Sequence, residues 1–348
     1  MAYRTLGRTG VEVSPLCLGA MMFGAWGNPD HDECHRIIQR ALDEGINFID
    51  TADVYSQGES EEIVGDFLAK AGPGVRHSIV LATKFHGRMG EGPNREGNSR
   101  RWVMSEVESS LRRLKTDYID LYQVHRPSPG TDIDETLSAL SDLVHQGKVR
   151  YFGTSTFPAW MVVEAHWASE RRGYERVATE QPPYSMLARG IETDLLQVTQ
   201  RYGMGVLSWS PLAGGWLSGK FGTGRDNTSR RAERLPARYD MSAPGNAAKL
   251  AAVDQLSDLA DKAGISLPEM AVAFVLNHPG VTSAIIGPRT MDQLTGLLGA
   301  PGTQLEGAVL DRIDEIVPPG QDLNIADAGW SPPWVTDPAL RRRQGAAQ

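Results

Sequence analysis

Four side chains able to do acid–base chemistry stand at or just beyond the ends of predicted strands in the first part of the chain. Asp50 ends a short apolar run that begins at Ile46, and Tyr55 follows five residues later. Lys84 and His125 end two further runs rich in strand-forming residues. A buried carboxylate needs a partner, and a positive charge beside a tyrosine favours tyrosinate and lowers the tyrosine pKa. These four residue types together indicate a site in which an aspartate holds a lysine, and the lysine adjusts the pKa of a tyrosine that gives up a proton.

These side chains can meet only if the strand ends converge. Strands and amphipathic helices alternate along the chain, which is typical of a parallel sheet. We expect an α/β fold, a (β/α)8 TIM barrel, whose strand ends gather catalytic groups at one mouth. The expected strands are 16–21, 46–50, 79–83, 118–123, 149–153, 177–180, 205–209 and 281–286, and the expected helices are 31–44, 59–70, 100–114, 132–146, 158–171, 192–202, 246–263, 268–277, 291–298 and 305–316.

The remaining segments complete one domain over residues 1–348, with no internal linker. Turn signals predict a β-hairpin at 3–14. Three long loops, 86–99, 211–245 and 318–337, would lie at or near the mouth, where they are freest to set substrate choice. The C-terminal tail covers 318–348 and frays at its end.

Three motifs carry a resemblance to a known family. Asp50-Thr51-Ala52 with Tyr55, Ala82-Thr83-Lys84, and Asp120-Leu121-Tyr122 with His125 resemble the aldo-keto reductase family, from about Tyr3 to about Leu298. The branch is similar to bacterial sugar ketoreductases and potassium-channel beta subunits. The resemblance implies that the hairpin closes the bottom of the barrel. It also implies carbonyl reduction, with Tyr55 as general acid, Lys84 tuning it, Asp50 orienting Lys84, and His125 polarising the substrate oxygen.

Each of these four residues also has an ordinary explanation when taken alone. A tyrosine after a strand can be a packing residue, and a strand-end lysine can be a solvated charge. An aspartate can cap the next helix or turn, and His125 can be a loop histidine. Their order along the chain is what favours the catalytic interpretation.

The cofactor cannot be held by a Rossmann fingerprint, because no Gly-x-Gly-x-x-Gly segment with that spacing follows a strand. The resemblance implies NADPH, with contacts from Gly19, Met21, Asp50, Ser155, Thr156, Gln181, Trp209, Ser210, Pro211, Leu212, Ala213, Gly214, Lys220, Arg230, Gly287, Arg289 and Gln293. Trp209 would stack on the nicotinamide. Arg289, before a helix N-terminus, would bind the 2′-phosphate. Thr156 and Leu297 stand where the family usually has asparagine.

The substrate pocket should be lined by aromatic and apolar side chains around the proton donor. The candidates are Phe23, Trp26, Tyr55, Phe85, His86, His125, Trp216 and Trp330, with Trp102 and Phe157 as further possible walls. We expect about half of these to be packing residues instead. The arginines around loop 86–99 would either favour a phosphate- or carboxylate-bearing substrate or be solvated; they are Arg88, Arg95, Arg100 and Arg101.

The composition is that of an ordinary globular protein, 41% hydrophobic and 22% charged. A net charge of −8 argues against nucleic acid as a partner. No apolar run is long enough for a membrane span, and the N-terminus lacks a secretion signal. Cys17 and Cys34 fit reduced thiols in a cytoplasmic protein without a metal site.

Three interpretations follow. The first is an NADPH-dependent reductase of small carbonyl compounds. The second is an NADPH-binding redox sensor or regulatory subunit with slow turnover, which the presence of His125 disfavours. The third, an isomerase or aldolase that uses Lys84 as a Schiff base, is disfavoured because a lysine paired with a carboxylate stays charged. The physiological substrate, the direction of reaction and the oligomeric state stay open.

Overall fold

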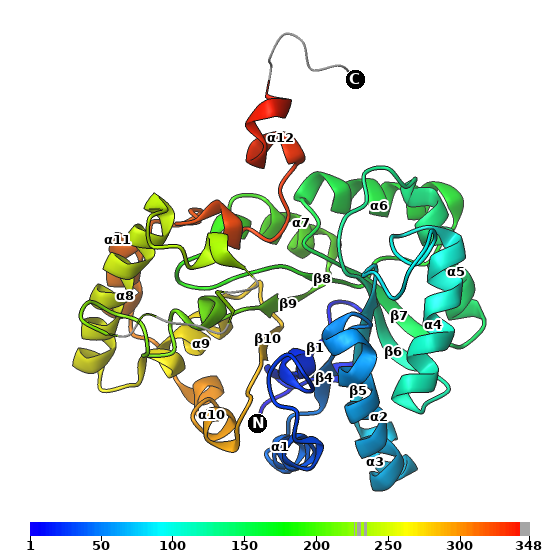
Figure 1. The fold of residues 1–348 in the computed structure, drawn as a ribbon, viewed down its shortest axis with the longest axis horizontal. Coiled ribbons are helices and arrows are strands. Elements are labelled where there is room, and N and C mark those ends of the chain that lie inside the picture. The colour runs from blue at the N-terminus through cyan, green and yellow to red at the C-terminus, as the bar shows by residue number, and fades with distance from the viewer. Residues whose placement is uncertain (226, 228–230, 233–234, 342–348) are drawn as a thin grey trace.

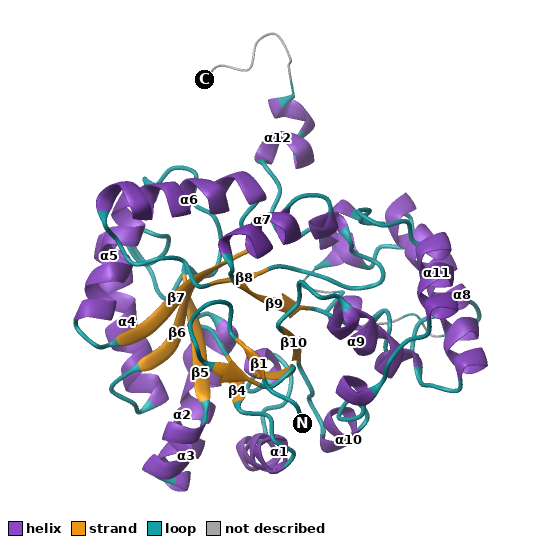
Figure 2. Ribbon diagram, turned by 180° about the vertical axis from the view of Figure 1, so that it is seen from behind, coloured by secondary structure: helices purple, strands orange, loops and turns teal. Residues whose placement is uncertain are grey.

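The computed structural model describes residues 1–225, 227, 231–232 and 235–341. Eight parallel strands form a closed barrel with hydrogen-bonded order β10-β3-β4-β5-β6-β7-β8-β9. Figures 1 and 2 show them at the centre of a ring of helices. The strands are β3 (Leu16–Gly19), β4 (Phe48–Asp50), β5 (Val80–Phe85), β6 (Ile119–Val124), β7 (Val149–Ser155), β8 (Thr179–Gln181), β9 (Gly205–Trp209) and β10 (Ser283–Ile286). The expected (β/α)8 barrel is confirmed.

The helices that cover the barrel are α1 (His31–Asp43), α2 (Glu59–Ala71), α3 (Pro73–Ser78), α4 (Arg100–Leu114), α5 (Ile133–His145), α6 (Ala159–Arg172), α7 (Leu195–Tyr202), α8 (Pro244–Ala263), α9 (Leu267–Asn277), α10 (Met291–Thr295) and α11 (Gly307–Ile316). Most bounds lie within a few residues of those expected. A further short helix, α12 (Pro333–Thr336), stands away from this ring (Figure 1).

Besides α12, which was not predicted either, two elements differ from expectation. The first barrel strand ends at Gly19 rather than at 21, because residues Ala20–Met22 turn into a 3₁₀ helix. The helix α3 was not predicted from the sequence. It is only one and a half turns long, too short for a helical repeat of apolar residues to show.

A hairpin closes one end of the barrel, as the resemblance implied. Strands β1 (Arg4–Thr5) and β2 (Glu12–Val13) pair antiparallel, with Arg4 opposite Val13. Leu6 and Val13 are fully buried and join the apolar cluster that fills the barrel interior. Ligands therefore have only the opposite end, where the strands finish, as a mouth.

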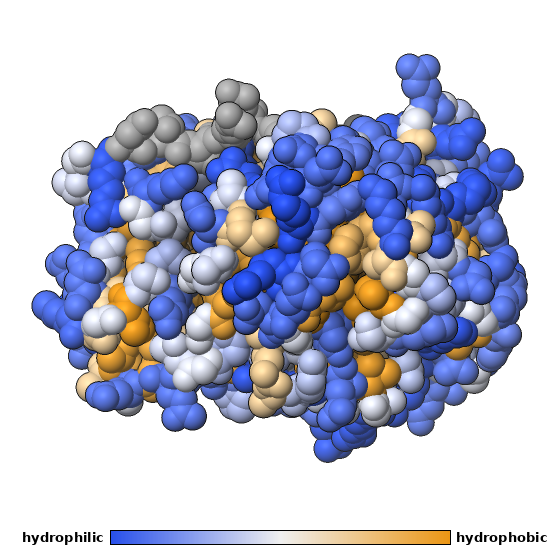
Figure 3. All heavy atoms as spheres, turned by 90° about the horizontal axis from the view of Figure 1, so that it is seen from below, coloured by the Kyte–Doolittle hydropathy of each residue, from blue (hydrophilic) through white to orange (hydrophobic). Residues whose placement is uncertain are grey.

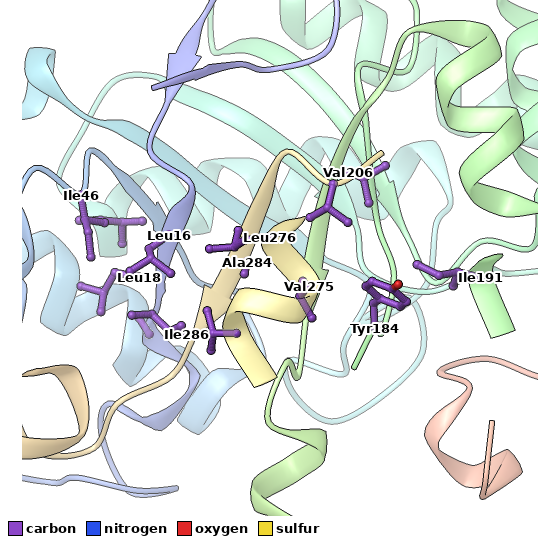
Figure 4. Close-up of a cluster of buried hydrophobic side chains, with 14 of the residues drawn as sticks. Leu16, Leu18, Ile46, Tyr184, Ile191, Val206, Val275, Leu276, Ala284 and Ile286 are labelled. Carbon is purple, nitrogen blue, oxygen red and sulfur yellow. The ribbon is translucent and has the colours of Figure 1, made fainter. Parts of the chain in front are cut away.

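Side chains alternate between the barrel interior and the helix layer. On β10, Ile285 belongs to the interior cluster, whereas Ala284 and Ile286 belong to the larger cluster under the helices. Figure 4 shows this outer layer, in which Leu16 and Leu18 of β3 lie near Leu276 of α9 and other labelled apolar side chains. The same alternation aims every second residue near the end of a strand into the mouth.

The outer surface carries charged and polar side chains. Figure 3, which views the molecule from below Figure 1, shows a largely hydrophilic face with apolar atoms in several separate patches. Among the described helices, none combines the length and the apolar character that crossing a bilayer requires. Both cysteines, Cys17 and Cys34, are buried and free.

Candidate active site

The ammonium group of Lys84 lies at the centre of the predicted tetrad. Its Nζ is 2.5 Å from Oδ2 of Asp50, 2.8 Å from the carbonyl oxygen of Thr51 and 3.3 Å from the hydroxyl of Tyr55. The side chains of Lys84 and Asp50 are 0% and 3% exposed. Residues from the ends of two neighbouring strands and from the loop after β4 thus form one buried ion pair that touches a phenol.

The carboxylate of Asp50 is held from the far side of the barrel as well. Its Oδ1 accepts hydrogen bonds from the Nε2 atoms of Gln123, at 3.1 Å, and Gln181, at 2.9 Å. Gln123 was not among the predicted site residues. Gln123 lies on β6, two positions before His125, which directly follows the strand. Because side chains alternate along a strand, Gln123 and His125 are expected to point to the same side, into the barrel.

The turn that presents Tyr55 is conformationally restricted. Residues Ser56 and Gln57 have φ values of +49° and +59°, which side chains seldom adopt. The Ser56 hydroxyl donates to the carbonyl of Phe23 and accepts from the Trp26 amide, which fixes this turn against the loop after β3. The phenol is therefore positioned by backbone geometry as well as by Lys84.

Two half-buried rings, those of His125 and Trp26, lie beside the phenol. The ring of His125 meets that of Tyr55 edge to face, with 5.6 Å between centroids, and the Trp26 ring lies 6.0 Å away. The structure thus brings Asp50, Tyr55 and Lys84 into direct contact and sets His125 against the tyrosine.

The pKa of Tyr55 is raised rather than lowered. Burial is the largest cause, and the charge of Asp50 adds to it, while Lys84 acts in the opposite direction. The expected fall of the Tyr55 pKa toward neutrality is not present in this state, because the effect of burial outweighs that of Lys84. Tyr55 therefore keeps its proton at neutral pH, as a proton donor must.

Burial also lowers the pKa of His125 well below its usual value, and the charges of Arg126, Lys84 and His86 add to this shift. The imidazole is therefore neutral at physiological pH. A neutral imidazole can donate one N–H hydrogen bond to a carbonyl oxygen, and it does not compete with Tyr55 as the donor of the proton.

The predicted nicotinamide contacts lie on the neighbouring strand ends. Ser155 donates to the carbonyl of Gln181 at 2.8 Å, so the ends of β7 and β8 are tied together. Thr156, which replaces the usual asparagine, has φ +58° and donates to the carbonyl of Ser155. Trp209 ends β9, and its buried indole nitrogen has no hydrogen-bond partner among the described residues.

A separate group of cations lies near the expected phosphate positions. Burial lowers the pKa of Arg231, and the neighbouring charges of Arg238 and Arg289 contribute to the shift. Nη2 of Arg231 also lies 3.3 Å from the sulfur atom of Met22. Met22 directly follows Met21, one of the predicted cofactor residues. These guanidinium groups act on one another in a protein of net charge −8, although Arg238 also pairs with Asp327. Such a group of cations fits an anionic ligand such as a dinucleotide phosphate.

Other predicted cofactor residues are placed as follows. Gly19 ends β3, Met21 lies in the 3₁₀ helix after it, and Gly287 directly follows β10. A turn after β9 contains Ser210, Pro211, Leu212, Ala213 and Gly214. The Gly214 amide donates to the Ser210 hydroxyl, and Gln293 accepts from the Arg289 amide. Lys220 is exposed, Leu297 is buried in the core, and Arg230 lies outside the described residues.

Comparison with known proteins shows to which family the chain belongs. The family profile named "Aldo/keto reductase family" matches residues 15–318. The chain belongs to the aldo/keto reductase family. Membership supports an oxidoreductase activity.

Among individual relatives, an oxidoreductase of Bacillus subtilis (strain 168), named "Uncharacterized oxidoreductase YrpG", is 38% identical over 94% of this chain and 100% of its own length. Two plant proteins named "Probable voltage-gated potassium channel subunit beta" are also similar. That of Arabidopsis thaliana is 35% identical and that of Oryza sativa subsp. japonica 34%, each over 91% of this chain and 97% of its own length.

The predicted pocket walls of this aldo/keto reductase divide into two groups. One group is packed in the hydrophobic core, each member no more than 2% exposed: Phe23, Phe85, Trp102, Phe157 and Trp216. Trp26, His86 and Trp330 are only half-buried and stay candidates for contact with substrate. The close approach of Gly329 to Thr156 and Pro183 brings the C-terminal segment with Trp330 to the ends of β7 and β8.

Three residues were missed by sequence reasoning: Gln123, Arg126 and Arg231. The alternation of side chains along a strand could have identified Gln123, because it lies two positions before His125. Arg126 directly follows His125, but its sequence position does not show that its side chain turns toward the mouth. Arg231 stands next to the predicted Arg230 in a segment without periodicity, where no pattern separates one arginine from the next. Among the described residues, no cluster of three or more histidine, cysteine, aspartate or glutamate side chains could hold a metal ion.

Proposed function

We propose that this aldo/keto reductase reduces aldehyde or ketone carbonyls to alcohols with NADPH, and that Tyr55 supplies the proton. The observation that carries the proposal is the position of Lys84 Nζ, in contact with both the Asp50 carboxylate and the Tyr55 hydroxyl. A buried ammonium 3.3 Å from a phenol stabilises the phenolate that remains once the proton has left.

Each side chain has one task. His125, neutral through burial, donates a hydrogen bond to the substrate oxygen and orients it toward the phenol. Tyr55 transfers its proton to that oxygen as negative charge develops there. Asp50 keeps Lys84 charged and fixed, with the amides of Gln123 and Gln181 holding the carboxylate in turn.

NADPH, when bound, supplies the hydride. Ser155, Thr156, Gln181 and Trp209 stand at the strand ends where a nicotinamide would lie. Arg289, with Arg231 and Arg238 nearby, favours a cofactor that carries the additional 2′-phosphate over NADH.

A second candidate function is an NADPH-binding regulatory subunit with slow turnover. It is favoured by the relatives named as potassium-channel beta subunits. His125 argues for the reductase, because a group that polarises the carbonyl serves turnover and adds nothing to cofactor binding.

The test is NADPH oxidation with a panel of activated aldehydes, with wild type beside Tyr55→Phe. We expect turnover by wild type, at least about a hundredfold loss in the variant, and unchanged NADPH binding by fluorescence titration. Tyr3→Phe is the matched control, because this tyrosine is exposed and its hydroxyl donates to the Gly45 carbonyl, away from the site. Equal turnover by wild type and Tyr55→Phe would refute the role of Tyr55, and NADPH binding without turnover would favour the regulatory subunit.

A further inference from the structure

Arg126 lies in the mouth directly after His125. Its Nη1 donates to the carbonyl oxygen of His125 at 2.8 Å, and its own carbonyl accepts from Asn98 at 3.0 Å. The guanidinium carbon is 5.9 Å from the centre of the Trp209 ring. The Arg126 side chain is thus fixed between His125, which is predicted to polarise the substrate oxygen, and Trp209, which is predicted to stack on the nicotinamide.

This guanidinium has no acidic partner among the residues that the structure describes. Other arginines with little exposure do have one: Arg113 pairs with Glu61 and Glu106, Arg189 with Glu192, and Arg238 with Asp327. Glu180 is the acid whose charge acts on Arg126, but burial raises its pKa to about 8, so it is mostly protonated at neutral pH. A half-buried cation is therefore left uncompensated.

The free edge of Arg126 has the form that binds anions. Nη1 is occupied by His125 and, more weakly, by the Thr156 hydroxyl at 3.5 Å. Nε and Nη2 make no hydrogen bond to any described residue. These two N–H groups are parallel and match the two oxygens of a carboxylate or phosphate.

The position suits a substrate group, because Arg126 acts electrostatically on both reacting neighbours. Its charge helps to depress the pKa of His125, after burial, and it opposes the burial that raises the pKa of Tyr55. An anion on Arg126 would therefore lie close to a carbonyl held by these two residues.

We propose that Arg126 binds an anionic group of the substrate, so that the preferred substrates are carbonyl compounds bearing a carboxylate or phosphate. This rests on the proposed function. The loop arginines considered at first do not offer the same feature, since Arg88 pairs with Glu96 and Arg100 with Asp142.

The test compares 4-carboxybenzaldehyde with its methyl ester, two aldehydes of similar shape that differ in charge, and adds glyceraldehyde 3-phosphate beside glyceraldehyde. We expect wild type to prefer at least one anion over its neutral match by about ten- to a hundredfold in kcat/KM. Which pair shows the preference identifies the carboxylate or the phosphate. In Arg126→Met the preference falls to about one, and Arg126→Lys, which keeps the charge without the fork, keeps part of it.

Calorimetric binding of 4-carboxybenzaldehyde and of glyceraldehyde 3-phosphate, without turnover, separates this proposal from the proposed function. Binding of either anion by wild type that Arg126→Met loses supports the anion site even if nothing is reduced. Turnover with no preference in either pair overturns the anion site and leaves the reductase standing. Equal preference in wild type and both Arg126 variants, each folded by circular dichroism, would also overturn it.

Discussion

Replacing Lys84 by methionine tests whether the buried ion pair stabilises the barrel as well as serving the chemistry. The substitution keeps the length of the side chain and removes Nζ. Three oxygens then lose their donor, namely those of Asp50, Thr51 and Tyr55. Asp50 is left as a buried charge with two amide donors from Gln123 and Gln181.

The cost can be bounded from this geometry. Removing one partner of a buried ion pair destabilises a protein by about 3–5 kcal/mol. Because two hydrogen bonds to the carboxylate survive, we expect the lower end, about 3 kcal/mol. Asp50→Asn alone leaves the ammonium buried and should cost about as much. The double variant contains neither charge, so its cost should fall short of the sum by about 2 kcal/mol or more.

The measurement is urea unfolding of wild type, both single variants and the double variant, followed by circular dichroism. The matched control is the same cycle on Arg312 and Glu315, an ion pair whose side chains are 47% and 65% exposed, where the coupling should stay below about 0.5 kcal/mol. If the two buried substitutions also add to within about 0.5 kcal/mol, the argument for a coupled pair is refuted.

Three further predictions follow from the same region. Burial raises the pKa of Glu180 from 4.5 to about 8, so the folded state holds its proton more tightly than the unfolded state. Wild type should therefore lose up to about 5 kcal/mol of unfolding free energy as pH rises between these values, and Glu180→Gln should flatten that slope in urea titrations across pH. A Cβ on Gly153 would lie 2.0 Å from Oγ1 of Thr179, so Gly153→Ala should destabilise by about 1–3 kcal/mol in thermal melts, while Gly130→Ala, with open space, should not. Since burial depresses the pKa of His125, kcat/KM for a neutral aldehyde should show no histidine inflection near 6.5, and a clear one there would contradict a neutral imidazole.

Regular elements were predictable from the sequence because local chemistry fixes their ends. The helix α4 begins and ends at the residues expected. Ser99 caps its N-terminus by accepting from the Trp102 amide, and Lys115 ends it in a left-handed conformation. The helix α3 has no side-chain cap, and the proline at its start is its one local signal.

That these four residues lie together was predictable because strand ends share one side of a barrel, but their electrostatics were not. The direction of the Tyr55 pKa depends on how deeply the phenol is buried and on how far Asp50 neutralises Lys84, which are properties of packing. For the same reason the aromatic candidates could not be ranked: Phe85 and Trp216 are as apolar as Trp26, and only tertiary contacts put them in the core.

The hydrogen bonds of Asp50 also join parts of the chain that are made far apart in time during synthesis. Its partners Gln123 and Gln181 are 73 and 131 positions further along the chain. The barrel that holds them together closes only when Ala284 on β10 pairs with Leu16 on β3. A chain emerging from the ribosome therefore cannot hold Asp50 with both amides inside a closed barrel until β10 has been made.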